Sequence, residues 1–180
     1  MAALALGTWW LVRNTTLPAS TPRTTTPRHE ADYEMRQFAV QRFSAQGGLR
    51  MHIEGEVLRH FPDTDTLEIN NVRIRAVAPN GRVTTATARH AVSNGDGTEV
   101  ELHGQAEVVR EATAGGEALR FQSEFLHAFI EEERVLTNKP VTITQGDTVV
   151  RTDRMDYTHA TELIQFSGRT HASFAPRSRP

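Results

Sequence analysis

The sequence predicts an all-β fold, and three observations support this prediction. From about residue 32 onward, apolar and polar side chains alternate, as they do in strands with one buried and one solvated face. Pairs of turn-forming residues interrupt the alternation at intervals of roughly a dozen residues. A segment of about 30 to 35 residues also recurs, which is typical of a supersecondary unit that stacks on its own copies.

The first element that we expect is a membrane anchor at residues 1–12. This apolar run ends near Trp9 and Trp10, but it is shorter than the roughly 20 residues that a spanning helix needs. It could be the core of a signal peptide, although no basic residue precedes it and no clean cleavage site follows. The favoured interpretation is the outer half of a truncated N-terminal transmembrane helix, with the tryptophans at the membrane–water interface. Residues 13–31, rich in threonine and proline, are expected to form a flexible linker.

Residues 32–175 form the predicted β domain, and residues 176–180 are expected to be a disordered tail. Leu49, Met51 and Ile53 alternate with polar residues near the start of the domain, and Val72 and Ile74 do so further along. Glycine, proline, asparagine and aspartate mark the turns, because they supply a positive φ or a preset proline φ. The expected turns are 46–48, 61–63, 79–81, 94–97, 114–116 and 145–147.

One stretch fits a helix almost as well as a strand. Phe121, Phe125 and Phe129 fall at helical spacing, and three glutamates follow them, as in a short amphipathic helix. The internal repeat favours a strand, since its first and third copies both have the form strand, turn and return strand. Its three copies are 88–104, 123–138 and 153–168. We therefore predict a strand over residues 121–130.

Composition and motifs point away from catalysis and nucleic-acid binding. The 180 residues carry a formal charge of −2 and no cysteine, so neither a basic binding surface nor a thiolate site is expected. The eight histidines have no metal-ligand spacing and are expected mostly at solvated strand positions. There is no nucleophile elbow and no phosphate-binding glycine loop. We predict no catalytic residue, metal or cofactor and no nucleic-acid partner.

Two features of the sequence, its arginine content and its apolar strand faces, each fit two interpretations. Lys139 is the only lysine among the basic residues, and the arginines fit either bidentate phosphate recognition or the codon usage of a GC-rich genome. Many apolar residues fall on one side of the expected strands, which fits either a packed sandwich core or a partly open sheet pair that accepts acyl chains.

Four segments of the β domain carry a resemblance to a known family. They are Gln46–Ile53, His60–Asp63, Leu102–Val108 and Val141–Gly146. With the anchor and linker ahead of them, the chain resembles the LptC family of lipopolysaccharide transport from about residue 32 to residue 174. The resemblance implies a twisted antiparallel β-jellyroll of the OstA/LptA type, open along a seam. It also implies a single-pass anchor in the inner membrane, with the bulk of the protein in the periplasm.

The resemblance further implies a non-enzymatic role in moving lipopolysaccharide from the inner to the outer membrane. The ABC transporter of LptB, LptF and LptG would supply the lipid, and the periplasmic bridge protein LptA would receive it. The residues expected to contact lipid are Met51, Ile53, Ile69, Val72, Ile74, Leu102, Phe121, Phe125, Val141 and Ile143. The residues expected to contact partners are Tyr33, Phe38, Val40, Gly47, Phe166, Ala172 and Phe174. Gly47 is expected in a corner too tight for a Cβ.

Two alternative functions remain. A soluble LptA-like bridge protein would share the jellyroll and the repeat, but it would carry a cleaved signal in place of an anchor. A carbohydrate-active enzyme on a β-scaffold would need two carboxylates that face each other across a groove.

Overall fold

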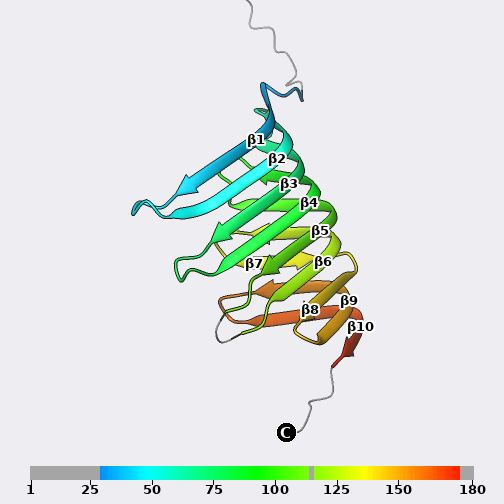
Figure 1. Cartoon of the computed structure of the whole chain (residues 1–180). Helices are drawn as coiled ribbons and strands as arrows, with labels where there is room; N and C mark the ends of the chain where they lie inside the picture. Colours follow the sequence, from blue (N-terminus) through cyan, green and yellow to red (C-terminus); the bar gives the residue numbers. More distant parts are fainter. Residues whose placement is uncertain (1–28, 114–115, 175–180) are drawn as a thin grey trace, which may run out of the picture.

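The computed structural model describes residues 29–113 and 116–174, and these residues form one antiparallel sheet of ten strands (Figure 1). The strands are β1 (Tyr33–Phe43), β2 (Leu49–Phe61), β3 (Thr66–Val77), β4 (Val83–Asn94), β5 (Glu99–Arg110), β6 (Leu119–Phe129), β7 (Arg134–Thr137), β8 (Val141–Gln145), β9 (Thr148–Thr158) and β10 (Leu163–Ser173). The all-β prediction is confirmed. The ambiguous stretch is the strand β6, with Ile130 in the turn after it.

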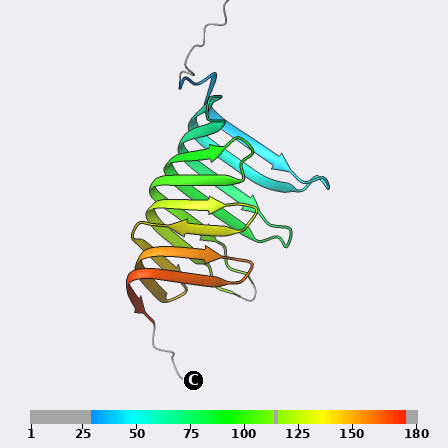
Figure 2. The ribbon, with the colours of Figure 1, turned by 180° about the vertical axis from the view of Figure 1, so that it is seen from behind.

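Apart from β7 and β8, each strand pairs with its neighbours in sequence, so the sheet runs as a meander from β1 to β10. Between β6 and β9 the short strands β7 and β8 share one place in the ladder, each pairing with a different part of both neighbours. Pro140 lies where the two separate, and it has no N–H to continue the ladder. The strands β1 and β10 lie at opposite ends of the stack (Figures 1 and 2).

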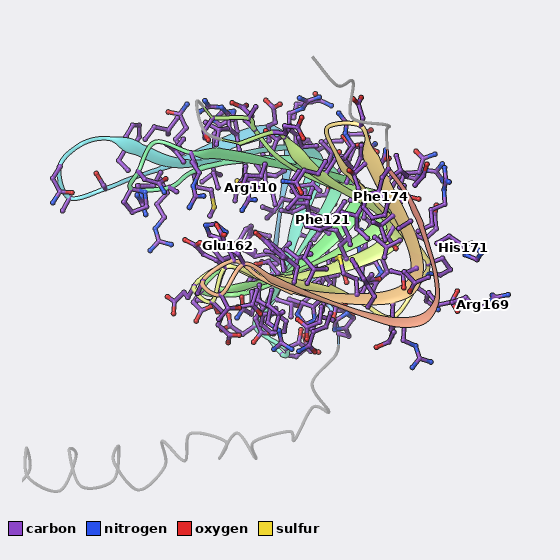
Figure 3. All side chains as sticks on the ribbon, turned by 90° about the horizontal axis from the view of Figure 1, so that it is seen from below. Arg110, Phe121, Glu162, Arg169, His171 and Phe174 are labelled. Carbon is purple, nitrogen blue, oxygen red and sulfur yellow. The ribbon has the colours of Figure 1, made fainter. Side chains whose placement is uncertain are left out.

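The long strands bend near their middle, so the sheet curls into two facing walls. The pairing of β4 with β5, of β5 with β6 and of β9 with β10 shifts register at these bends. Gln37, Asn71 and Gln105 have φ near +50° at gaps in the ladder, where they redirect the backbone. Figure 3 shows the curl closed on the side of Arg169 and open on the side of Glu162.

The turns line the open side. We call the two walls upper and lower from their places in Figure 3. The turns 44–48 and 78–82 lie at the free end of the upper wall, and the turns 62–65, 95–98, 130–133 and 159–162 lie at the free end of the lower wall. Each predicted turn overlaps a connection between strands, although Phe61, Asn94 and Gln145 are the last residues of β2, β4 and β8. Residues 114–115 lie outside the described residues. All three repeat copies are antiparallel hairpins, formed by β4–β5, β6–β7 and β9–β10.

Besides its ladder with β2, the edge strand β1 contributes a single side chain to the core. Phe38 is the only buried residue of β1, and its ring lies over Gly55 of β2. A Cβ at position 55 would lie 2.8 Å from Phe38 Cε1 and 2.7 Å from Ile69 Cγ2. Glycine therefore lets the aromatic ring close onto the sheet.

We expect Gly55→Ala to lower the free energy of unfolding by about 1–3 kcal/mol, as overpacking does elsewhere. Urea unfolding followed by circular dichroism would measure this change. Gly48→Ala is the matched control, because a Cβ there meets only Ser44 Oγ, at 3.5 Å. Equal stability of both variants would contradict the packing of Phe38 over Gly55.

Candidate functional site

A cavity of about 710 Å³ lies between the two walls and reaches the open side. Alternation along the strands places apolar side chains on its inner surface. The upper wall contributes Met51, Ile74, Ala86, Val108, Leu119 and Phe121, and the lower wall contributes Val100, Leu102, Ala128, Val135 and Tyr157. The volume lies within the roughly 300–1,000 Å³ typical of ligand pockets. The interior of the curled sheet can therefore hold the hydrocarbon part of a ligand.

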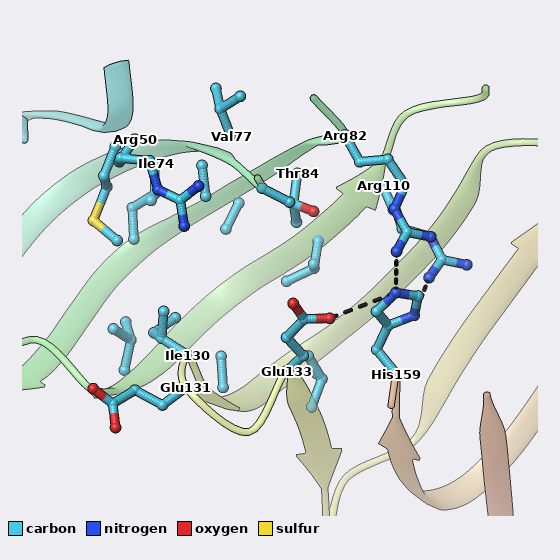
Figure 4. Close-up of a pocket in the computed structure, with 18 of the residues that line it drawn as sticks. Arg50, Ile74, Val77, Arg82, Thr84, Arg110, Ile130, Glu131, Glu133 and His159 are labelled. Carbon is cyan, nitrogen blue, oxygen red and sulfur yellow. Dashed lines mark hydrogen bonds and ion pairs between the residues drawn. The ribbon is translucent and has the colours of Figure 1, made fainter. Parts of the chain in front are cut away.

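Charged side chains surround the mouth of this cavity, and the two walls carry different charges. Arg42, Arg50, Arg82 and Arg110 belong to the upper wall. Glu131, Glu133 and His159 belong to the lower wall (Figure 4). Arg134, the first residue of β7, lines the cavity on the same wall. Arg134 is neutralised by Asp156 through hydrogen bonds of 2.8 and 2.5 Å, which hold the pKa of the Asp156 carboxyl below its ordinary value. The upper rim is therefore basic.

One side-chain cluster joins the walls across the mouth. His159, on the turn after β9, contacts Arg82 through Nε2 and lies 2.7 Å from Arg110 Nη1 through Nδ1. Tyr157 OH accepts a 2.7 Å hydrogen bond from Arg110. Glu133 Oε2 lies 3.5 Å from His159 Nε2. The cluster connects segments far apart in sequence, and no motif in the sequence indicates it.

The cavity brings together four of the residues that were expected to contact lipid. Met51, Ile74, Leu102 and Phe121 line it. Five others pack in the core or against it without lining the cavity: Ile53, Ile69, Val72, Val141 and Ile143. Phe125 lies apart from the cavity lining and packs against His103, with ring centroids 5.0 Å apart. The alternation of apolar and polar residues did not indicate Ala86 and Ala128, whose small side chains line the cavity and leave space in it.

The residues expected to contact partners lie at or near the two edges of the sheet. Tyr33 and Val40 on β1 are exposed, as are Phe166 and Ala172 on β10 and Phe174 beyond it. Phe38 is buried instead, as part of the core. Each edge strand pairs with one neighbour only, so one side of its backbone is free among the described residues.

The reason expected for Gly47 is wrong, because the corner is open. A Cβ there would meet nothing within 4 Å. The φ of +81° explains the glycine, since residues with a side chain rarely adopt it.

The expectation that most histidines are solvated holds only in part. His29 and His171 are exposed, but the other six are half-buried. Several contact carboxylates; a 2.7 Å hydrogen bond with Asp32, for example, raises the pKa of His60. Within residues 29–113 and 116–174, no group of three potential ligands could hold a metal ion. The carboxylates that line the cavity, Glu131 and Glu133, share one turn and do not face each other across it.

A curled antiparallel sheet that encloses an apolar cavity with an open side defines a β-jellyroll suited to binding an amphiphile. The chain belongs to the LptC family, because the family model described as "Lipopolysaccharide-assembly, LptC-related" matches residues 1–175. The resemblance inferred from the sequence is thus confirmed. Among curated proteins, the search found no match.

A similar solved structure is that of LptH from Pseudomonas aeruginosa, described as the LptA homologous periplasmic component of the conserved lipopolysaccharide transport device. It matches with a TM-score of 0.61 and 10% sequence identity, over 70% of this chain and 95% of LptH. At this identity the match supports the fold, and it confirms the expected LptA-like jellyroll.

The structure describes no helix that is long and apolar enough to cross a bilayer. The expected anchor at residues 1–12, most of the linker and the tail at 176–180 lie outside the described residues.

Proposed function

We propose that this protein carries lipopolysaccharide through the periplasm by holding its acyl chains in the cavity between the two walls. The observation that carries the proposal is the apolar cavity with one open side, in a member of a lipopolysaccharide-assembly family. The open side lets the sugar part of the lipid stay in water while the chains are buried. Each buried methylene contributes about 0.8 kcal/mol, so a few carbons of one chain already give useful affinity.

The free edges suit assembly with partners. A partner strand could add to β1 or β10 by main-chain hydrogen bonds, which would extend the two walls into a neighbouring jellyroll. We propose that β1 faces the LptB, LptF and LptG transporter and that β10 faces LptA. Residues 1–12 would anchor the chain in the inner membrane through the linker at 13–31, with the jellyroll at 32–175 in the periplasm. Neighbouring jellyrolls with similar affinity for the lipid would exchange it with little change in free energy. Such an exchange has no direction of its own, so net direction would come from the transporter.

Photo-crosslinking in intact cells can test the lipid path with two neighbouring threonines of β4. Thr84 lines the cavity, whereas Thr85 is the next residue and points to the opposite face of the sheet. Both are half-buried, so a photoreactive residue should be tolerated equally at either position. We expect the probe at position 84 to capture lipopolysaccharide and the probe at 85 to capture little.

A third probe, at the exposed Phe174, is expected to capture the bridge protein. Equal lipid labelling from positions 84 and 85 would refute the proposed lipid path. Lipid labelling at 84 without a protein adduct at 174 would refute only the proposed β10 contact.

A further inference from the structure

The ring of His159 faces more hydrogen-bond donors than it can accept from. A neutral imidazole has one acceptor nitrogen, and a protonated one has none. Both ring nitrogens of His159 nevertheless face guanidinium groups, those of Arg82 and Arg110. A guanidinium has only donors and stays charged. In either tautomer, one of these two contacts therefore places N–H against N–H.

The neighbouring groups do not remove this excess. Tyr157 OH accepts from Arg110, but one hydroxyl cannot also serve Arg82 from the far side of the imidazole ring. Glu133 approaches His159 at 3.5 Å, and within residues 29–113 and 116–174 neither Arg82 nor Arg110 forms an ion pair with a carboxylate. Arg134 at the same mouth differs, since Asp156 holds it through two hydrogen bonds. Two half-buried cations thus converge on one imidazole, and the nearby carboxylate of Glu133 contacts the ring rather than either guanidinium.

Arg82 and Arg110 lie where the head group of a ligand in the cavity would be. Both guanidinium groups lie at its mouth, on the rim that also carries Arg50 (Figure 4). Arg42 lines the cavity on the same wall. A ligand whose chain lies among Phe121 and Leu102 would place its head group at this rim. Arginine binds phosphate and carboxylate oxygens through paired N–H groups, and such bonds are stronger than neutral ones.

We propose that Arg82 and Arg110 form a binding site for the phosphate or carboxylate group of an acylated ligand whose hydrocarbon occupies the cavity. This inference rests on the proposed function and adds to it the part of the ligand that is recognised. The oxyanion accepts hydrogen bonds from both guanidinium groups and so supplies the missing acceptor. His159 lies between the two arginines and accepts from one of them at most, so it neutralises neither.

The test measures the affinity of the full chain for lipid A and for lipid A from which the phosphates have been removed. A second pair, phosphatidate and diacylglycerol, shows whether the phosphate of a phospholipid is also accepted. We expect the wild type to bind phosphorylated lipid A at least about tenfold more tightly than the dephosphorylated form, since charge-assisted hydrogen bonds are worth this much. The double variant R82Q/R110Q should lose this preference and keep its affinity for dephosphorylated lipid A.

The control is R36Q/R169Q, which removes one arginine from each edge strand; Arg36 forms an ion pair with Glu34, and Arg169 forms one with Asp153. It should retain the preference of the wild type. An R82Q/R110Q protein that still prefers phosphorylated lipid A overturns the inference, as does a wild type without any preference. Wild-type protein that binds neither form of lipid A would instead refute the proposed function, and the inference with it.

Discussion

Leu126→Ala is expected to lower the free energy of unfolding by about 2–5 kcal/mol, which is a large part of the stability of a domain of this size. Leu126 is fully buried on β6, opposite Leu102 of β5 in the ladder. It belongs to the hydrophobic core and does not line the cavity, so its removal leaves a void in packed structure. Urea unfolding of the purified protein measures the change as a shift in midpoint.

The matched control for this experiment is Leu163→Ala on β10, where the leucine is 51% exposed. It should change stability by less than about 0.5 kcal/mol, as surface substitutions usually do. If the two leucines contributed equally, the core would not lie between the walls at β5 and β6.

Sequence pattern predicted the strands and turns well wherever local rules decide the structure. On β3, Val72 and Ile74 are buried while Arg73 and Arg75 are exposed, as strict alternation requires. The bends could not be predicted in this way. On β6, Phe121 is buried, yet the next fully buried residue is Leu126 and not Phe125. The register shift between β5 and β6 changes which side chains face inward, and it depends on the neighbouring strand.

The candidate site was predicted only in part, for a related reason. Ile69 and Ile74 lie on the same strand and have the same apolar character, but Ile74 lines the cavity and Ile69 does not. The two isoleucines lie on opposite sides of the bend at Asn71, and Ile69 packs beside Phe38 at Gly55. No local pattern encodes this difference. The convergence of Arg82, Arg110 and His159 likewise depends on pairing across the whole sheet. The abundance of arginine was visible in the sequence, but its placement was not.

Ala86→Phe is expected to weaken lipopolysaccharide binding by at least about tenfold and to leave the fold intact. Ala86 lines the cavity on β4, so the added ring would occupy space that acyl chains need. Because the ring enters open volume, we expect stability to change by less than about 1 kcal/mol, below the usual penalty for overpacking. Equilibrium binding of lipopolysaccharide and urea unfolding measure the two effects on the same protein.

Ala91→Phe provides the contrast, because Ala91 lies on the same strand but is 1% exposed in the packed core. The same added ring should there lower the free energy of unfolding by about 1–3 kcal/mol or more, since no space receives it. The two variants thus differ in what they damage: the first removes binding and the second removes stability. Full lipid affinity in a stable Ala86→Phe protein would show that acyl chains do not occupy the space between the walls.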